Sequence, residues 1–205
     1  MAISTYAELQ TAIADWLNRD DLTSVIPTFI TLTEAALNRQ LRVNEMIERD
    51  TSTISGGYVN MPVDWLETIS LITIGSPPVV LEYVAQMGMA EVRATQRAGD
   101  PIVYTIINNK FQIFPAPSAS TDVEMTYYAK IPTLSNNNTS NWLLANHPDA
   151  YLFGSLVHAE PYLKNDERMP MWASMYKGSI DAIGYASERA KRPEGGLHSR
   201  KRTFG

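Results

Sequence analysis

YAELQTAIADWLNRDDLTSVIPTFITLTEAALNRQLR, residues 6–42, holds two amphipathic patterns separated by a polar break. Apolar residues recur at intervals of three and four on both sides of residues 18–21. Because this spacing places them on one side of a helix, it predicts helices at about Thr5–Asn18 and Ser24–Arg42.

The ends of these two helices carry recognisable signals. Thr5 and Glu8 have the spacing of a capping box, in which each side chain accepts a hydrogen bond from the other residue's backbone. In the second helix, Pro27 suits the first turn, with Thr23 or Ser24 as the N-cap.

The middle of the chain, about residues 47–132, has the apolar spacing and turn residues of β-strands. Gly56-Gly57 and Asn108-Asn109 each separate two short apolar runs, which predicts two hairpins. One short helix is expected between Met87 and Gln96. The expected strands are Thr51–Ser55, Tyr58–Met61, Thr68–Ile74, Val103–Ile107, Lys110–Phe114 and Val123–Ile131.

The last third returns to helical spacing. Wide apolar coverage predicts a buried helix at Asp149–Leu163, which Pro161 should kink or end. A further helix is expected at Met169–Arg189, with Pro170 in its first turn. Its single apolar stripe is expected to comprise Trp172, Met175, Tyr176, Ile180 and Ile183.

These patterns together predict an α+β fold. Residues 1–46 and 142–190 are expected to form a helical bundle, residues 47–141 a β-rich insertion, and residues 191–205 an extended, flexible, basic C-terminal tail. Five large side chains are expected to be largely buried among the helices: Trp16, Phe29, Leu37, Leu156 and Trp172.

The overall composition excludes several classes of protein. The 205 residues are 44% hydrophobic and 19% charged, values that exclude disordered, collagen-like and coiled-coil chains. No apolar run reaches the ~18 residues that a membrane-spanning helix needs. The first residues, MAISTYAELQ, lack the pattern of a secretory signal, so synthesis in the cytoplasm is expected. The chain has no cysteine, which excludes disulfides and thiolate chemistry.

Charge is distributed unevenly along the chain. Residues 189–205 hold six basic residues and one acid, a net charge of +5, whereas residues 1–188 hold 11 basic and 21 acidic residues, a net charge of −10. Such asymmetry is typical of a segment that binds a partner.

The sequence gives little support for a catalytic site or a metal site. Three histidines, His147, His158 and His198, are the candidates for a general base or metal ligand, but none belongs to a ligand motif. Capping explains His147 and core packing explains His158, so no metal or cofactor is expected.

Two alternatives to a structural role remain. A small cytoplasmic hydrolase could use carboxylates, which cluster at residues 45–50 and 166–167, although their places near helix ends favour solvated charge. Gly154-Ser155 lacks the glycine spacing of a nucleophile elbow. A basic-tailed nucleic-acid-binding protein would bind duplex DNA through Arg200-Lys201-Arg202 with strong salt dependence.

Three stretches of the chain resemble the head-to-tail adaptor, or connector, proteins of tailed bacteriophages. Their order along the chain matches the family, and together they cover about half of it. The stretches are the two-helix opening at residues 6–42 with WLNRDDL at its bend, YVNMPVDWL at residues 58–66, and YLFGSLVHAEPYLKNDERMPMW at residues 151–172.

The resemblance implies a non-enzymatic virion protein of the head–tail interface. Such a protein is expected to form a ring, commonly a dodecamer, that docks on the portal protein and offers a platform to tail or nozzle proteins. Genomic DNA is expected to pass through its lumen without sequence-specific binding, which an acidic body would favour. No membrane contact is expected.

The basic tail is the expected portal-binding site. It pairs a cluster of cations with an aromatic side chain that has no local core to join, the composition of an interface anchor. The expected portal-binding residues are Lys191, Arg192, Arg200, Lys201, Arg202 and Phe204.

Overall fold

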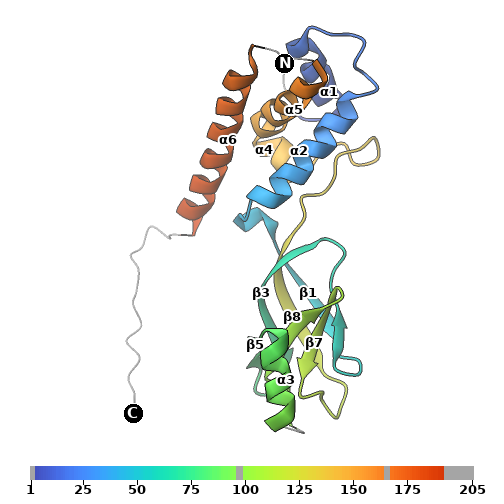
Figure 1. Cartoon of the computed structure of the whole chain (residues 1–205), viewed down its shortest axis with the longest axis vertical. Helices are drawn as coiled ribbons and strands as arrows, with labels where there is room; N and C mark the ends of the chain where they lie inside the picture. The colour runs from blue at the N-terminus through green and yellow to red at the C-terminus, as the bar shows by residue number, and fades with distance from the viewer. Residues whose placement is uncertain (1–2, 96–98, 164–166, 192–205) are drawn as a thin grey trace. The chain divides into compact units, whose positions relative to one another are not determined.

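A computed structural model describes residues 3–95, 99–163 and 167–191 and shows a mixed α+β fold, as predicted. The chain divides into two compact units, of which one is helical and the other is rich in strands (Figure 1). We call residues 1–45 and 131–205 the helical unit and residues 46–130 the β unit.

Helix α5 lies at the centre of the helical unit and contacts the other four helices. Its buried residues point in several directions around its axis, so no single stripe is apolar, which is the pattern of a helix covered on most sides. The helices of this unit are α1 (Tyr6–Leu17), α2 (Ile26–Gln40), α4 (Trp142–Asn146), α5 (Pro148–Leu163) and α6 (Met169–Ala190).

The predicted capping box at the start of α1 is confirmed. The hydroxyl of Thr5 accepts a hydrogen bond from the backbone N–H of Glu8, and the Glu8 carboxylate accepts one from the backbone N–H of Thr5 at 3.0 Å. Hydrogen bonds from the backbone N–H and the hydroxyl of Ser4, with a further contribution from Thr5, lower the pKa of Glu8 to about 2. Asn18 ends the helix in the left-handed region, with φ of 54°.

The predictions that α2 and α6 have proline in their first turns are confirmed, whereas the predicted N-cap of α2 was wrong. Pro27 and Pro170 lie in the first turns of α2 and α6. The N-cap of α2 is Val25, which makes no side-chain cap, rather than Thr23 or Ser24. The hydroxyl of Thr23 instead donates to the carbonyl of Asp20, within the loop that precedes the helix.

Pro161 does not end α5 immediately, and the helix continues through this residue to Leu163.

Four of the five large side chains expected in the helical core are buried there, namely Phe29, Leu37, Leu156 and Trp172.

The exception is Trp16, which is 41% exposed. It lies in the last turn of α1, and its ring makes an edge contact with Phe153, at 5.5 Å between ring centroids.

Residues 131–141, which were expected in the β-rich insertion, belong to the helical unit. Polar side chains of α2 hold this segment: Asn38 Oδ1 accepts from the backbone N–H of Ile131 at 2.9 Å, and Glu34 Oε1 accepts from that of Leu134 at 2.7 Å. Asn141 closes the segment by donating to the carbonyl of Pro132 at 2.7 Å. These bonds satisfy backbone groups that would otherwise be buried without partners.

The described residues of the β unit form two four-stranded sheets and one helix, α3 (Gln86–Thr95). A short 3₁₀ helix, η1 (Asn44–Met46), lies where the chain enters the unit. The first sheet has the strand order β1-β8-β3-β4 and the second has the order β2-β7-β6-β5. The strands are β1 (Ile47–Thr53), β2 (Tyr58–Asn60), β3 (Trp65–Ile74), β4 (Val79–Val80), β5 (Glu82–Tyr83), β6 (Val103–Ile107), β7 (Lys110–Phe114) and β8 (Asp122–Ala129).

Alternation along β8 shows how the core of the β unit forms. Val123, Met125, Tyr127 and Ala129 are buried, while the residues between them are partly exposed. Because successive side chains of a strand point to opposite faces, one face of β8 lines the core and the other lies outward. The core is completed mainly by side chains of both sheets, with Leu71 and Phe111 fully buried.

One predicted hairpin is confirmed, and the other forms only at its turn, where Ser55 and Tyr58 exchange backbone hydrogen bonds around Gly56-Gly57. β6 and β7 pair around Asn108-Asn109, whose φ values of 48° and 60° match a tight hairpin turn. The strands on either side of Gly56-Gly57 share only the Ser55–Tyr58 bridge and enter different sheets. Beyond this bridge, the first of them, β1, pairs with β8 along seven residues.

Candidate functional site

The helical unit contains a buried polar cluster that the sequence did not reveal. Glu34 is only 4% exposed, and its Oε1 accepts hydrogen bonds from the hydroxyl of Tyr151 and the backbone N–H of Leu134. The side chain of Asn141 donates to the Tyr151 hydroxyl at 2.8 Å. Burial raises the pKa of Glu34 above its ordinary value.

This cluster is closed and serves packing. Its carboxylate, phenol and amide bond to one another or to backbone groups, and the side chains that hold them are buried. A substrate could reach the cluster only if α2, α4 and α5 separated. A carboxylate that bonds a distant backbone segment was not predictable from local spacing, because residues 34 and 134 lie far apart in the sequence.

The structure describes two of the three histidines, and each lies in or at the end of a helix of the helical unit. His147 ends α4, where its backbone N–H donates to the carbonyl of Leu143 at 2.7 Å. His158 lies half-buried on α5, and burial together with nearby Arg39 lowers the pKa of its imidazole. His198 lies outside the described residues.

The structure describes four of the five carboxylates singled out in the sequence. Glu48 and Asp50 are exposed on β1, and Glu45 lies in η1. Glu167 precedes α6, and Asp166 lies outside the described residues. Within residues 3–95, 99–163 and 167–191, no group of acidic or histidine side chains has the arrangement of a metal site.

In the β unit, three acidic residues, Glu48, Asp50 and Asp64, affect the pKa of Tyr127. The hydroxyl of Tyr127 donates to Asp64 Oδ1 at 3.2 Å. Burial and the charge of Asp64, with smaller effects from Asp50 and Glu48, raise the pKa of Tyr127 to about 12. The phenol therefore stays protonated at neutral pH and serves as a hydrogen-bond donor.

The β unit has two hollows whose linings include polar side chains. The larger, of about 490 Å³, lies between β1, β2 and the β6–β7 turn, and its lining is Ser52, Thr53, Ser55, Tyr58, Asn60, Ile107, Asn108 and Lys110. The smaller, of about 370 Å³, lies under α3 and includes Arg93, Thr105 and Gln112. Neither lining contains a carboxylate or an imidazole.

Helix α6 exposes several large side chains. The sequence predicted one apolar stripe on this helix that included Met175. The structure shows an inward stripe that contains buried Trp172 and Ile183, while Met175 is 41% exposed and lies on a second, outward stripe.

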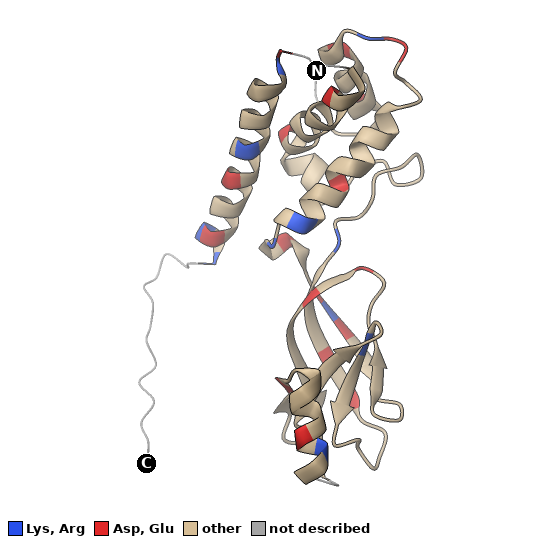
Figure 2. Ribbon diagram, viewed as in Figure 1, with Lys and Arg blue, Asp and Glu red and all other residues tan. Residues whose placement is uncertain are grey.

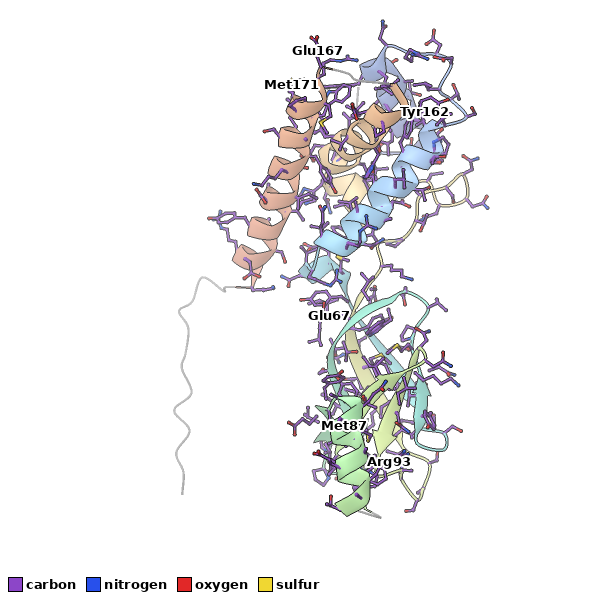
Figure 3. The ribbon with its side chains drawn as sticks, viewed as in Figure 1. Glu67, Met87, Arg93, Tyr162, Glu167 and Met171 are labelled. Carbon is purple, nitrogen blue, oxygen red and sulfur yellow. The ribbon has the colours of Figure 1, made fainter. Side chains whose placement is uncertain are left out.

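We call this outward stripe the α6 seam. It consists of Met171, Met175, Gly178, Ala182 and Tyr185, all of which are exposed. Figure 3 labels Met171 near the start of α6. Figure 2 shows that charged residues form only a few bands along α6. The two charged residues nearest the middle of the helix, Lys177 and Asp181, lie beside the seam and do not belong to it.

Only one residue of the predicted portal-binding site is described. Lys191 follows the end of α6, where it is exposed and its ammonium group lies 2.7 Å from Glu188 Oε1. The other five predicted portal-binding residues, Arg192, Arg200, Lys201, Arg202 and Phe204, lie outside the described residues.

None of the helices in the described part of the chain is long and apolar enough to cross a membrane. A comparison with curated proteins found no match. A comparison with protein-family models found that residues 4–200 match the SU10 adaptor protein family. The match includes all three stretches on which the resemblance rested and extends through both compact units. The chain therefore belongs to this family of phage head-to-tail adaptor proteins.

Proposed function

We propose that this protein is a structural, non-enzymatic part of the virion that forms a ring, expected to be dodecameric, between the portal and the tail. The ring docks on the portal protein, forms part of the DNA channel and supplies the surface to which tail or nozzle proteins attach. The observation that carries the proposal is the family match over residues 4–200, because adaptor proteins as a class contact portal and tail proteins.

The charge distribution supports a DNA channel. Residues 1–188 have a net charge of −10, and acidic residues of β1 such as Glu48 and Asp50 are exposed. A negatively charged wall repels the phosphate backbone and so lets a duplex slide instead of gripping it.

The portal anchor is the basic segment 191–205. Its cations would meet an acidic surface of the portal, and Phe204 would enter an apolar pocket there, an arrangement in which an aromatic residue contributes most of the binding energy and charges orient it. Lys191 is already paired with Glu188, so the four cations farther along the segment and Phe204 are expected to dominate binding.

Deletion of residues 198–205 tests the anchor. The truncated protein should keep its fold and melting temperature, bind the portal more weakly and give heads that leak DNA. Two narrower variants separate the contributions: Arg200→Gln/Lys201→Gln/Arg202→Gln should reduce binding in a salt-dependent way, and Phe204→Ala in a salt-independent way.

Arg189→Gln is the matched control, because it removes an exposed positive charge from α6 without touching the segment 198–205. It should leave portal binding unchanged. If the truncated protein still docks and its particles remain infectious, the segment is not the portal anchor.

A further inference from the structure

The α6 seam lacks the charge that a helix face exposed to water normally carries. Met171, Met175 and Tyr185 are 46%, 41% and 72% exposed, and the seam has no charged residue between Met171 and Tyr185. A helix on the surface of a globular protein usually has polar or charged residues over its exposed side, and on α6 these are Lys177, Asp181 and Glu188, which lie beside the seam. An uncharged stripe of this length with large exposed side chains marks a surface for a partner.

The spacing of the seam indicates that its partner is a helix. Its residues follow one another at intervals of four, three, four and three, the alternation of a coiled-coil seam. A Cβ added at Gly178 would meet no atom within 4 Å, so the backbone is open to an approaching element at this point. Gly178 and Ala182 in the middle would let another helix come close, while Met and Tyr at the ends would pack around it.

Two other occupants of the seam fit poorly. Residues 192–205 contain four Lys and Arg but only two large apolar residues, Leu197 and Phe204, too few to supply an apolar contact at each turn. DNA fits no better, because an uncharged stripe offers no cation to phosphate.

A second copy of the chain supplies a surface of the required kind. On α2, Thr28, Leu32 and Ala35 are exposed, uncharged and again separated by four and three residues, with Leu32 46% exposed. The seam and this α2 surface are different faces of the same unit, on two helices that both contact α5. Contact between two different faces is what a ring requires, whereas a contact of one face with itself gives a two-fold dimer.

We infer that the α6 seam packs against the helical unit of a neighbouring copy and forms one side of the contact that closes the ring. This inference rests on the proposed ring and names the surface that each copy contributes to it. The seam thus serves assembly, whereas the inward stripe of α6 serves folding.

Charge introduced into the seam tests the inference. Ala182→Glu would place a carboxylate in the contact, and burial of an unpaired charge there should reduce the assembled fraction about tenfold or more. The matched control is Lys177→Glu, which changes the charge of the same helix by a larger amount beside the seam. The control should assemble normally, and both variants should keep the circular dichroism and melting temperature of the original protein.

A photo-crosslinking residue at Met175 identifies the partner directly. Nitrogen-15-labelled and unlabelled copies are mixed, assembled with and without the portal ring of the same phage, illuminated and digested. The expected product joins labelled and unlabelled chains and maps to α1, α2, α4 or α5 of the second copy. A product that joins α6 to α6 would instead indicate a two-fold contact and would overturn the inference.

Several results would overturn the inference while leaving the adaptor function intact. These are rings that show no adduct between labelled and unlabelled chains, adducts confined to residues 46–130 or 192–205, and adducts with the portal alone. If electron microscopy shows no ring even with the portal present, the proposed ring itself fails and the seam contact fails with it.

Discussion

Gly154 lies where α5 approaches both α2 and α6, and its replacement by alanine tests how tightly the helical unit is packed. A Cβ at this position would lie 2.5 Å from Thr33 Cγ2 and 3.0 Å from Tyr176 Cε2. Thr33 cannot turn away freely, because it is fully buried and its hydroxyl donates to the carbonyl of Phe29 at 2.8 Å. Gly154→Ala should therefore overpack the junction.

The expected magnitude combines two opposing effects. Overpacking of a core costs about 1–3 kcal/mol, whereas replacing glycine by alanine within a helix contributes about 1 kcal/mol. The free energy of unfolding should therefore fall by up to about 2 kcal/mol. Gly184→Ala on α6 is the matched control, since no atom lies within 4 Å of its added Cβ, and it should raise the free energy of unfolding by up to about 1 kcal/mol.

Urea denaturation followed by tryptophan fluorescence measures this change. Three of the four tryptophans, Trp16, Trp142 and Trp172, belong to the helical unit, so a Trp65→Phe background reports on that unit alone. Thr33→Ser removes the clashing methyl group and keeps the hydroxyl, so in the double variant the cost of Gly154→Ala should largely disappear. If Gly154→Ala stabilises the unit as Gly184→Ala does, and the two changes at residues 33 and 154 add independently, the junction is not tightly packed.

Further changes probe the core and the buried carboxylate. Leu156→Ala should cost about 2–5 kcal/mol, because Leu156 is fully buried, and a loss below about 0.5 kcal/mol in the same denaturation assay would place it outside the core. Trp16→Ala should cost clearly less than Leu156→Ala, and an equal loss would mean that Trp16 is buried in solution. Because the pKa of Glu34 is raised above its ordinary value of 4.5, the stability linked to Glu34 is present below that pH and is lost as the pH rises through the folded-state pKa. Glu34→Gln keeps an acceptor oxygen and removes the charge. The melting temperature of this variant, relative to that of the original protein, should therefore rise between pH 4 and pH 8. A difference in melting temperature that stays constant with pH would show that the carboxylate is not desolvated.

Elements fixed by neighbouring residues were predictable from the sequence. The Thr5–Glu8 capping box, the prolines in the first turns of α2 and α6, and the Asn108-Asn109 hairpin each depend on residues a few positions apart. The physical cause and its signal therefore lie in the same short stretch of chain.

Features that depend on distant residues were not predictable. β1 could pair locally across Gly56-Gly57 or with β8, and the second pairing forms seven residue pairs. Residues 131–141 carry no local sign that Glu34 and Asn38 bind them. In both places a contact between residues far apart in the sequence outweighs the local pattern.

The two candidate surfaces, the basic segment 191–205 and the α6 seam, also differ in how far the sequence reveals them. The charge asymmetry that suggests a portal anchor is visible in the composition alone. The α6 seam is also present in the sequence, as the spacing of residues 171–185, but Met175 was assigned to the inward stripe because one apolar stripe is the usual pattern of a surface helix. Only the exposed fractions of Met171, Met175 and Tyr185 separate the two stripes.

Electron microscopy of this protein mixed with the portal ring of its phage examines the proposed ring itself. The adaptor function predicts a closed ring seated on one end of the portal, with an opening wide enough for a duplex of about 20 Å diameter. Failure to dock on the portal, or a closed ring without such an opening, would contradict it.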